Sequence, residues 1–309
     1  MQAPNLSVED VKDILHGCKE IITDLEYQDK GGQKTVYKCK INGELFALKF
    51  CDITDSNNNE ANKDHENNDS EQSENSVLSR AKREIDIMDK VDTPTLVKLG
   101  PIGLQIVDYK DKTLLYFSEE FIEGKDLHNI IQETPLSIED SIELAINITT
   151  AIDNLWSISM VHRDIKPKNI MRRENGQFVL LDTGIAFDIQ GETLTAAFSL
   201  IGSPIYMSPE QLSGLRRELD FRSDLFLLGI VLYEAVTGTH PFFQSGLNTY
   251  QIVANITNNK LVPISTHVQD IPKKFERIIM RLLAKEPHLR YKSCEQLLKQ
   301  LYSLKEELL

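Results

Sequence analysis

The spacing of apolar residues changes at about Leu127, and this change constrains the fold more than any other feature. Before it, Val36–Ile41 and Glu44–Phe50 have the pattern of two strands around Asn42-Gly43, which supplies the positive φ values of a tight hairpin turn. Later, apolar residues recur at helical spacing in a stripe that Ser137 can cap: Ile142, Ala145, Ile148, Ile152 and Leu155. The pattern predicts an α+β chain with a small antiparallel β lobe followed by a larger, mostly helical lobe.

One main helix interrupts the β-rich part of the chain. Residues 76–91 predict this helix, and Glu84 lies on its otherwise apolar stripe. Residues 94–123 then return to short apolar segments compatible with strands. A chain of 309 residues is too long for one small core. We therefore place one lobe at residues 1–122 and the other at residues 123–309, and we expect a cleft between them.

Residues 52–75 are rich in Asn, Asp, Glu and Ser and poor in apolar residues. The segment holds eight acidic residues and one lysine, so it carries −7 of the chain's net charge of −13. Such a composition buries too little apolar surface to offset the entropy of ordering. We expect a disordered acidic insertion, either a solvated spacer or a docking and regulatory segment.

The overall composition excludes several classes of partner. A net charge of −13 argues against nucleic acid, because phosphate backbones bind basic surfaces. No apolar run approaches the roughly 18 residues that span a bilayer, so no membrane association is expected. Four scattered cysteines contain no C-x-x-C pair and indicate reduced thiols. These features together predict a cytoplasmic protein, and they leave its oligomeric state open.

The strongest chemical signal is the segment His162–Asn169, followed by Asp182-Thr183-Gly184. Phosphoryl transfer requires positioning and charge neutralisation more than covalent help from the protein. Asp164 suits the carboxylate that accepts a hydroxyl proton, and Lys166 can reach a transferred phosphate. The amide oxygen of Asn169 and the carboxylate of Asp182 are hard ligands that suit Mg²⁺.

With these motifs, the sequence resembles the eukaryotic-type (Hanks-type) protein kinase family. Residues 162–169 match the catalytic loop of that family, and Asp182-Thr183-Gly184 occupies the place of its D-F-G motif. Lys166-Pro167 resembles the serine/threonine branch. The resemblance implies a two-lobed kinase fold that transfers the γ-phosphate of Mg·ATP to a protein hydroxyl, with Asp164 as catalytic base.

Lys49, in Ala47-Leu48-Lys49, matches the ATP-binding lysine of the family, and Ala47 is assigned to the nucleotide site with it. A carboxylate on an apolar helix stripe is costly unless it is paired. An inward Glu84 that meets an inward Lys49 resolves this cost. The pair resembles the family's Lys–Glu ion pair, which aims the lysine at the α- and β-phosphates.

The glycine-rich loop departs from the pattern of the family. The motif should end at Val36, which places Asp29, Gly31 and Lys34 at its three glycine positions. Gly31, with Gly32 beside it, can still let backbone N–H groups approach a phosphate, and Lys34 can add a charge contact. We assign Gly31, Gly32, Lys34 and Val36 to the nucleotide site.

Two further departures face the nucleotide. Residues 119–124 resemble the hinge of the family, so backbone groups near Glu120 and Ile122 should meet the adenine edge. The same register puts Glu119 at the gatekeeper position, where a carboxylate needs a partner that the sequence does not identify. Thr183 replaces the phenylalanine of the metal motif and removes roughly 1–2 kcal/mol of apolar burial.

The loop at 184–209 resembles an activation segment, and its end, Gly202–Glu210, matches G-T-x-x-Y-M-A-P-E with two substitutions. The resemblance pairs Glu210 with Arg290 and lets Asp224 hold the catalytic loop. Arg163 can engage a phosphorylated loop residue, and the candidates are Thr193, Thr195 and Ser199. The set Glu210, Asp224 and Arg290 favours a protein substrate.

Two alternatives to an active serine/threonine kinase stay open at this point. The incomplete glycine loop, Thr183 and Glu119 are compatible with a pseudokinase that acts as a binding scaffold. A small-molecule phosphotransferase of related fold is the other alternative. The complete set of ion-pair, base and metal-binding residues favours the active kinase.

Overall fold

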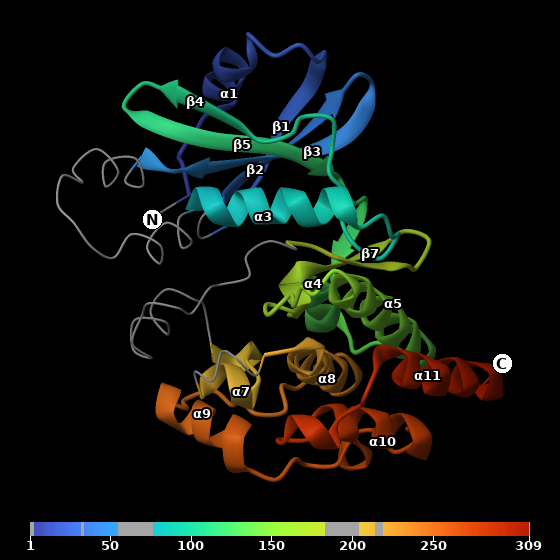
Figure 1. Cartoon of the computed structure of the whole chain (residues 1–309). Coiled ribbons are helices and arrows are strands. Elements are labelled where there is room, and N and C mark those ends of the chain that lie inside the picture. The colour runs from blue at the N-terminus through green and yellow to red at the C-terminus, as the bar shows by residue number, and fades with distance from the viewer. Residues whose placement is uncertain (1–2, 32–33, 55–76, 183–203, 214–218, 309) are drawn as a thin grey trace. The chain divides into compact units, whose positions relative to one another are not determined.

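The computed structural model describes residues 3–31, 34–54, 77–182, 204–213 and 219–308 (Figure 1). The chain divides into two compact units. The first unit contains residues 1–92 and 97–122, and the second contains residues 93–96 and 123–309.

The first unit is built on a five-stranded antiparallel sheet with the order β1-β2-β3-β5-β4. Its strands are β1 (Ile22–Lys30), β2 (Lys34–Ile41), β3 (Glu44–Asp52), β4 (Gln105–Tyr109) and β5 (Lys112–Glu120). The predicted hairpin joins β2 and β3, and Asn42 and Gly43 have φ values of 53° and 91°. Positive φ at both turn residues matches the right-handed twist of the flanking strands.

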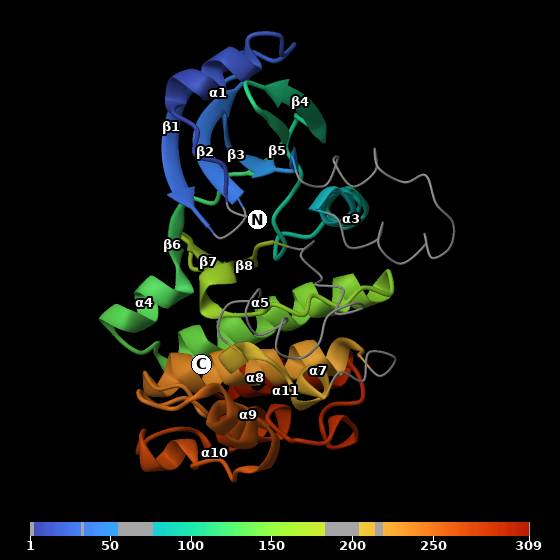
Figure 2. The same ribbon diagram turned by 90° about the vertical axis from the view of Figure 1, so that its left-hand side faces the viewer.

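The two faces of this sheet are covered by different helices (Figure 2). On one face, Tyr37, Leu48 and Phe50 pack with apolar residues of α1 (Val8–Leu15) in one core cluster. On the other face lies α3 (Val77–Lys90), which occupies the helix predicted at 76–91. The described part of its predicted stripe, Ala81, Glu84, Met88 and Val91, is buried.

The periodicity predicts neither α1 nor β1. The helix α1 has only eight residues, although Ser7 and Asp10 form a complete capping box at its start. The strand β1 is mostly exposed, and register shifts interrupt its pairing with β2 at two places. Because such irregularities break the two-residue alternation, the strand lacks the signal on which the prediction depends.

The boundary predicted for the acidic insertion is wrong at its N-terminal side. Asp52 is the last residue of β3 and pairs with Leu114, while the Ile53 N–H donates to the carbonyl of Thr113. The Asp52 carboxylate also accepts a hydrogen bond from Thr54 and forms an ion pair with Lys112. Composition groups these residues with the acidic segment, but β pairing holds them in the sheet. Residues 55–75 lie outside the described residues.

The second unit is mainly helical. Its helices are α4 (Leu127–Glu133), α5 (Ile138–Ser157), α7 (Pro209–Leu212), α8 (Phe221–Thr237), α9 (Thr249–Asn258), α10 (Lys273–Leu282) and α11 (Cys294–Leu308). Ser137 caps α5 by accepting a hydrogen bond from the Asp140 N–H, and the predicted stripe of α5 is buried. Short strands β6 (Gly124–Asp126), β7 (Ile170–Arg173) and β8 (Phe178–Leu180) form a small antiparallel sheet.

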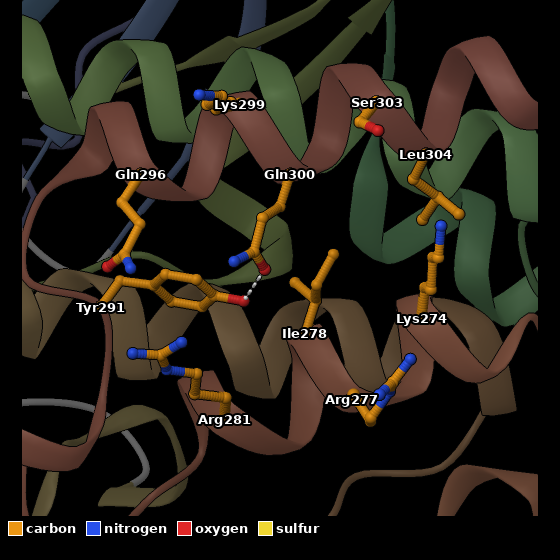
Figure 3. A pocket seen from close by; sticks show the side chains of 10 residues that line it. All are labelled: Lys274, Arg277, Ile278, Arg281, Tyr291, Gln296, Lys299, Gln300, Ser303 and Leu304. Carbon is orange, nitrogen blue, oxygen red and sulfur yellow. Dashed lines mark hydrogen bonds between the residues drawn. The ribbon is translucent and has the colours of Figure 1, made fainter.

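A pocket of about 660 Å³ lies along α10 and α11 on the second unit (Figure 3). Its lining is rich in cations, and the Tyr291 hydroxyl donates to the side chain of Gln300 within it. The ring of Tyr291 is covered by the guanidinium of Arg281, and Lys274 is paired with Glu307. These contacts account for two of the cations that line the pocket.

Within the described ranges, the chain contains no helix that is both long enough and apolar enough to cross a membrane.

Candidate active site

The segment 162–169 forms a loop between α5 and β7 that is anchored by Asp224 at the start of α8. The two carboxylate oxygens of Asp224 accept hydrogen bonds from the backbone N–H groups of His162 and Arg163, each at 2.7 Å. Arg163 has a φ of 68°, which a non-glycine residue adopts only when its surroundings require it. Burial raises the pKa of Asp224, and His162 and the two N–H donors oppose this rise.

Asp164 is held by two neighbours within the same loop. The Lys166 ammonium donates to both Asp164 carboxylate oxygens, at 2.9 and 2.8 Å. The Asn169 amide nitrogen donates to the Asp164 main-chain oxygen at 2.9 Å and to its carboxylate at 2.8 Å. The side chains of Asp164 and Lys166 are 29% and 33% exposed. The carboxylate is thus fixed in direction and still open to water.

Asp182 follows β8 on the chain and is linked to the same loop through its neighbour Leu181. The Leu181 N–H donates to the Asn169 carbonyl at 2.8 Å, and a His162 ring nitrogen lies 2.9 Å from the Leu181 carbonyl. Asp182 has a φ of 55°. These bonds bring residues 164, 169 and 182 into one region of the second unit, whereas Thr183 and Gly184 lie outside the described residues.

The chemistry of this donor set fits a magnesium ion. The nitrogen of the Asn169 amide is used by Asp164, so the group is oriented by that bond and its oxygen is the remaining donor atom. An amide oxygen and the Asp182 carboxylate are the hard ligands that Mg²⁺ prefers. Among the described residues, no group of three or more His, Cys, Asp and Glu forms a protein-only metal cage. Mg²⁺ bound through one or two carboxylates usually takes its remaining ligands from phosphate and water.

The predicted pair of Glu210 and Arg290 is present and buried. The Arg290 guanidinium donates to both Glu210 oxygens, at 2.6 and 2.9 Å, and Ser223 donates to one of them at 2.7 Å. Burial raises the pKa of Glu210, but the Arg290 hydrogen bond and charge outweigh it and leave the pKa below its ordinary value. The pair fixes the end of the segment that begins at Pro204.

Tyr206, in the same segment, is fixed by two residues that the sequence does not single out. Its hydroxyl donates to the Glu234 carboxylate, and its ring meets His240 edge-to-face at 5.1 Å. The His240 Nδ1 atom accepts the N–H groups of Phe242 and Phe243, at 3.1 and 3.0 Å. Burial lowers the pKa of His240 to about 4.

In the first unit, the strand register places charged side chains on the face that α3 covers. Lys49 lies opposite Val36 on β2 and opposite Phe117 on β5. On β3, the register partner of Lys34 is Cys51 and that of Glu119 is Ala47. Each of these partners is two residues from Lys49 along the strand. Side chains that differ by two residues share a face, so Lys34, Lys49 and Glu119 all point toward α3.

The predicted contact of Lys49 with Glu84 is present but is not the shortest contact of either residue. Lys49 Nζ lies 3.8 Å from Glu84 and 2.8 Å from Glu119. Glu84 instead receives two hydrogen bonds from Lys34, at 2.9 and 2.8 Å. Lys49 is therefore a close partner of Glu119, and sequence reasoning missed Lys34 as a partner of Glu84. The signal that could have predicted the contact of Lys34 with Glu84 is that Lys34 on β2 lies on the same face of the sheet as Lys49 on β3.

The remaining residues assigned to the nucleotide lie in the first unit. The Gly31 N–H donates to the Lys34 carbonyl at 2.9 Å and closes the turn between β1 and β2, while Gly32 lies outside the described residues. Ala47 and Ile122 are buried. Glu120 ends β5, and its N–H donates to the Lys98 carbonyl.

Comparison with known proteins identifies the family. The model of the family described as the protein kinase domain matches residues 29–303. The chain belongs to the protein kinase family. The observed units, one built on an antiparallel sheet and one mainly helical, confirm the predicted kinase fold class.

Bacterial relatives of this kinase carry serine/threonine kinase names. A probable serine/threonine-protein kinase of Clostridium perfringens is 30% identical over 286 residues, which are 92% of this chain and 38% of the relative. Serine/threonine-protein kinase PrkC of Bacillus subtilis is 30% identical over 72% of this chain and 33% of its own length. Serine/threonine-protein kinase pkn3 of Myxococcus xanthus is 33% identical over 67% of this chain and 40% of its own. The chain thus spans two fifths or less of these relatives, whose names lend no support to the scaffold alternative.

Proposed function

We propose that this chain transfers the γ-phosphate of Mg·ATP to a serine or threonine hydroxyl of a protein. The observation that carries the proposal is the fixed Asp164 carboxylate, held by Lys166 and Asn169 in a loop that Asp224 anchors. A carboxylate oriented in this way and open to water is suited to accept the proton of an incoming hydroxyl. The names of the relatives support the serine/threonine class.

Each remaining group has a role in this proposal. Lys166 moves from Asp164 to the transferred phosphate and offsets its charge. Lys49 contacts the α- and β-phosphates, while Glu120 and Ile122 offer backbone groups to adenine. Asn169 and Asp182 hold Mg²⁺, which neutralises phosphate charge when it is bound. Gly31, Gly32, Val36 and Ala47 complete the proposed nucleotide contacts, and Lys34 adds its charge beside them while it stays bound to Glu84.

The catalytic role of Asp164 is tested by phosphate transfer from labelled ATP with Mg²⁺, to the chain itself and to generic protein substrates. Asp164→Ala should lower the rate by about 10²–10⁴-fold, because the acceptor of the hydroxyl proton is lost. Asp270→Ala is a matched control, since Asp270 is exposed in the same unit. Nucleotide binding without any transfer by the unmodified chain would favour the scaffold, and transfer only to a small molecule would favour the related phosphotransferase.

Regulation by phosphorylation forms a separate part of the proposal. Thr193, Thr195 and Ser199 lie outside the described residues and stay candidates for phosphorylation that Arg163 would engage. Mass spectrometry after incubation with ATP should find phosphate within residues 193–203. An active enzyme without phosphate in that range would exclude the idea.

The cellular location also belongs to the proposal. None of the four cysteines, all of which lie in the described residues, forms a disulfide, and three of them are buried, which fits a reducing compartment such as the cytoplasm.

A further inference from the structure

Four charged side chains form a buried charge cluster in the first unit: Lys34, Lys49, Glu84 and Glu119. The exposed fractions of their side chains are 12%, 6%, 1% and 5% in that order. These four side chains contribute two positive and two negative charges. Charges this far from water are tolerated when they are paired, and a single unpaired member would be costly.

The distances divide the cluster into two close pairs. Lys34 binds both oxygens of Glu84, and Lys49 lies 2.8 Å from Glu119. The contact that links the pairs, between Lys49 and Glu84, is 1 Å longer at 3.8 Å. A separation of 3.8 Å retains Coulomb attraction but is too long for a hydrogen bond. Glu84 on α3 is therefore hydrogen-bonded by a residue of β2.

We propose that Lys34 and Glu119 are a compensating pair of positioning residues: Glu119 holds Lys49, and Lys34 anchors Glu84 in its place. The extra acid on β5 draws Lys49 away from α3, and the extra base on β2 supplies the charge that Glu84 then lacks. Each of the two residues thus supplies the close partner of one member of the predicted Lys49–Glu84 pair.

The pairing has a consequence for the nucleotide, which rests on the proposed function. A phosphate that binds Lys49 competes with the carboxylate of Glu119, 2.8 Å from the ammonium nitrogen. Binding of a triphosphate should therefore be weaker than with a neutral residue at 119. In contrast, α3 keeps its anchor through Lys34 while Lys49 changes partner.

The compensation is tested first without nucleotide, by thermal unfolding of Lys34→Met, Glu119→Gln and the double variant. Each single change removes the close partner of a buried charge, Glu84 or Lys49, and should lower the melting temperature by about 5–15 °C. The double variant retains Lys49 and Glu84 as one neutral pair, so its melting temperature should exceed that of either single variant. A double variant that melts no higher than the single variants would overturn the proposal.

Lys40→Met is the matched control for this series. Lys40 lies on the same face of β2 as Lys34, and its side chain is 44% exposed in an ion pair with Asp24. Its loss should change the melting temperature by less than about 2 °C, and combining it with Glu119→Gln should give no recovery. Recovery by this control would show that any loss of a lysine suffices, and would also overturn the specific pairing.

The positioning role is tested by calorimetric titration with adenosine and with a non-hydrolysable ATP analogue plus Mg²⁺. Glu119→Gln should strengthen binding of the analogue about tenfold, because Lys49 no longer has a competing carboxylate, and should leave adenosine within about twofold. Equal changes for both ligands would indicate a structural role only and would overturn the positioning role. If the unmodified chain binds neither ligand, the proposed function fails, and the melting series alone decides the compensation.

Discussion

Replacing Arg290 by lysine separates the contribution of charge in its buried ion pair from that of guanidinium geometry. Besides the two bonds to Glu210, its N–H groups reach the carbonyls of Ala284, Arg222 and Lys285 at 2.9, 2.7 and 3.1 Å. All five donors are thus used, whereas a lysine ammonium has three donors on one atom. At least two buried acceptors lose their partner, at about 1–3 kcal/mol each, so the substitution should cost about 2–6 kcal/mol.

For a unit of this size, such a cost lowers the melting temperature by on the order of 10 °C. The assay is calorimetric and urea unfolding of Arg290→Lys beside Arg277→Lys, a change at an exposed position of α10. The control should stay within about 0.5 kcal/mol of the unmodified chain. If Arg290→Lys folds with the same stability as the control, charge alone holds the pair, and the reasoning from donor geometry is wrong.

Three further predictions follow from single residues. Because the folded-state pKa of His240 is lowered from 6.5 to about 4, the unfolded chain binds a proton first on acidification. The contribution of neutral His240 to the free energy of unfolding is complete above pH 6.5 and falls by up to about 3 kcal/mol toward pH 4. Urea unfolding as a function of pH should show this loss. His240→Asn, which keeps an acceptor, should make the loss smaller. Gly124→Ala should destabilise by at least about 2 kcal/mol, because φ is 153° and a Cβ would meet the Arg172 carbonyl, whereas Gly103→Ala has open space and should be nearly neutral in the same unfolding assay. Asp224→Asn places an amide donor against one of two backbone N–H groups; we expect a loss of about 1–3 kcal/mol on unfolding and slower phosphate transfer with unchanged nucleotide affinity.

Local sequence signals were sufficient where the structure depends on neighbouring residues. Asn42-Gly43 specifies its own turn, and Ser137 caps the helix that directly follows it. Within the loop around Asp164, the contacts of Asp164 with Lys166 and Asn169 also join residues at most five positions apart. In these cases the physical cause and the sequence signal occupy the same short segment.

Sequence reasoning failed where contacts depend on strand register. The partner of Glu119 is 70 residues away on the chain, and only the pairing of β3 with β5 brings Lys49 onto the adjacent position. The contact of Lys34 with Glu84 likewise spans 50 residues. Asp52 shows the same effect at a boundary. As an acidic residue it was grouped with the acidic segment, whereas its β pairing with Leu114 places it in the sheet. Periodicity gives the face of a strand but does not give its neighbour.

The short segment 93–96 limits how the two units of this kinase can be exchanged with those of another kinase. The chain leaves the first unit after Asp92, returns at Val97 and leaves again after Ile122. Within the second unit, Leu96 forms a parallel bridge with Leu180, whose N–H donates to the Thr95 carbonyl. A chimera with a single junction at 122 would carry foreign residues into this strand contact. A successful exchange of units therefore needs three junctions, with the four recipient residues at 93–96 retained.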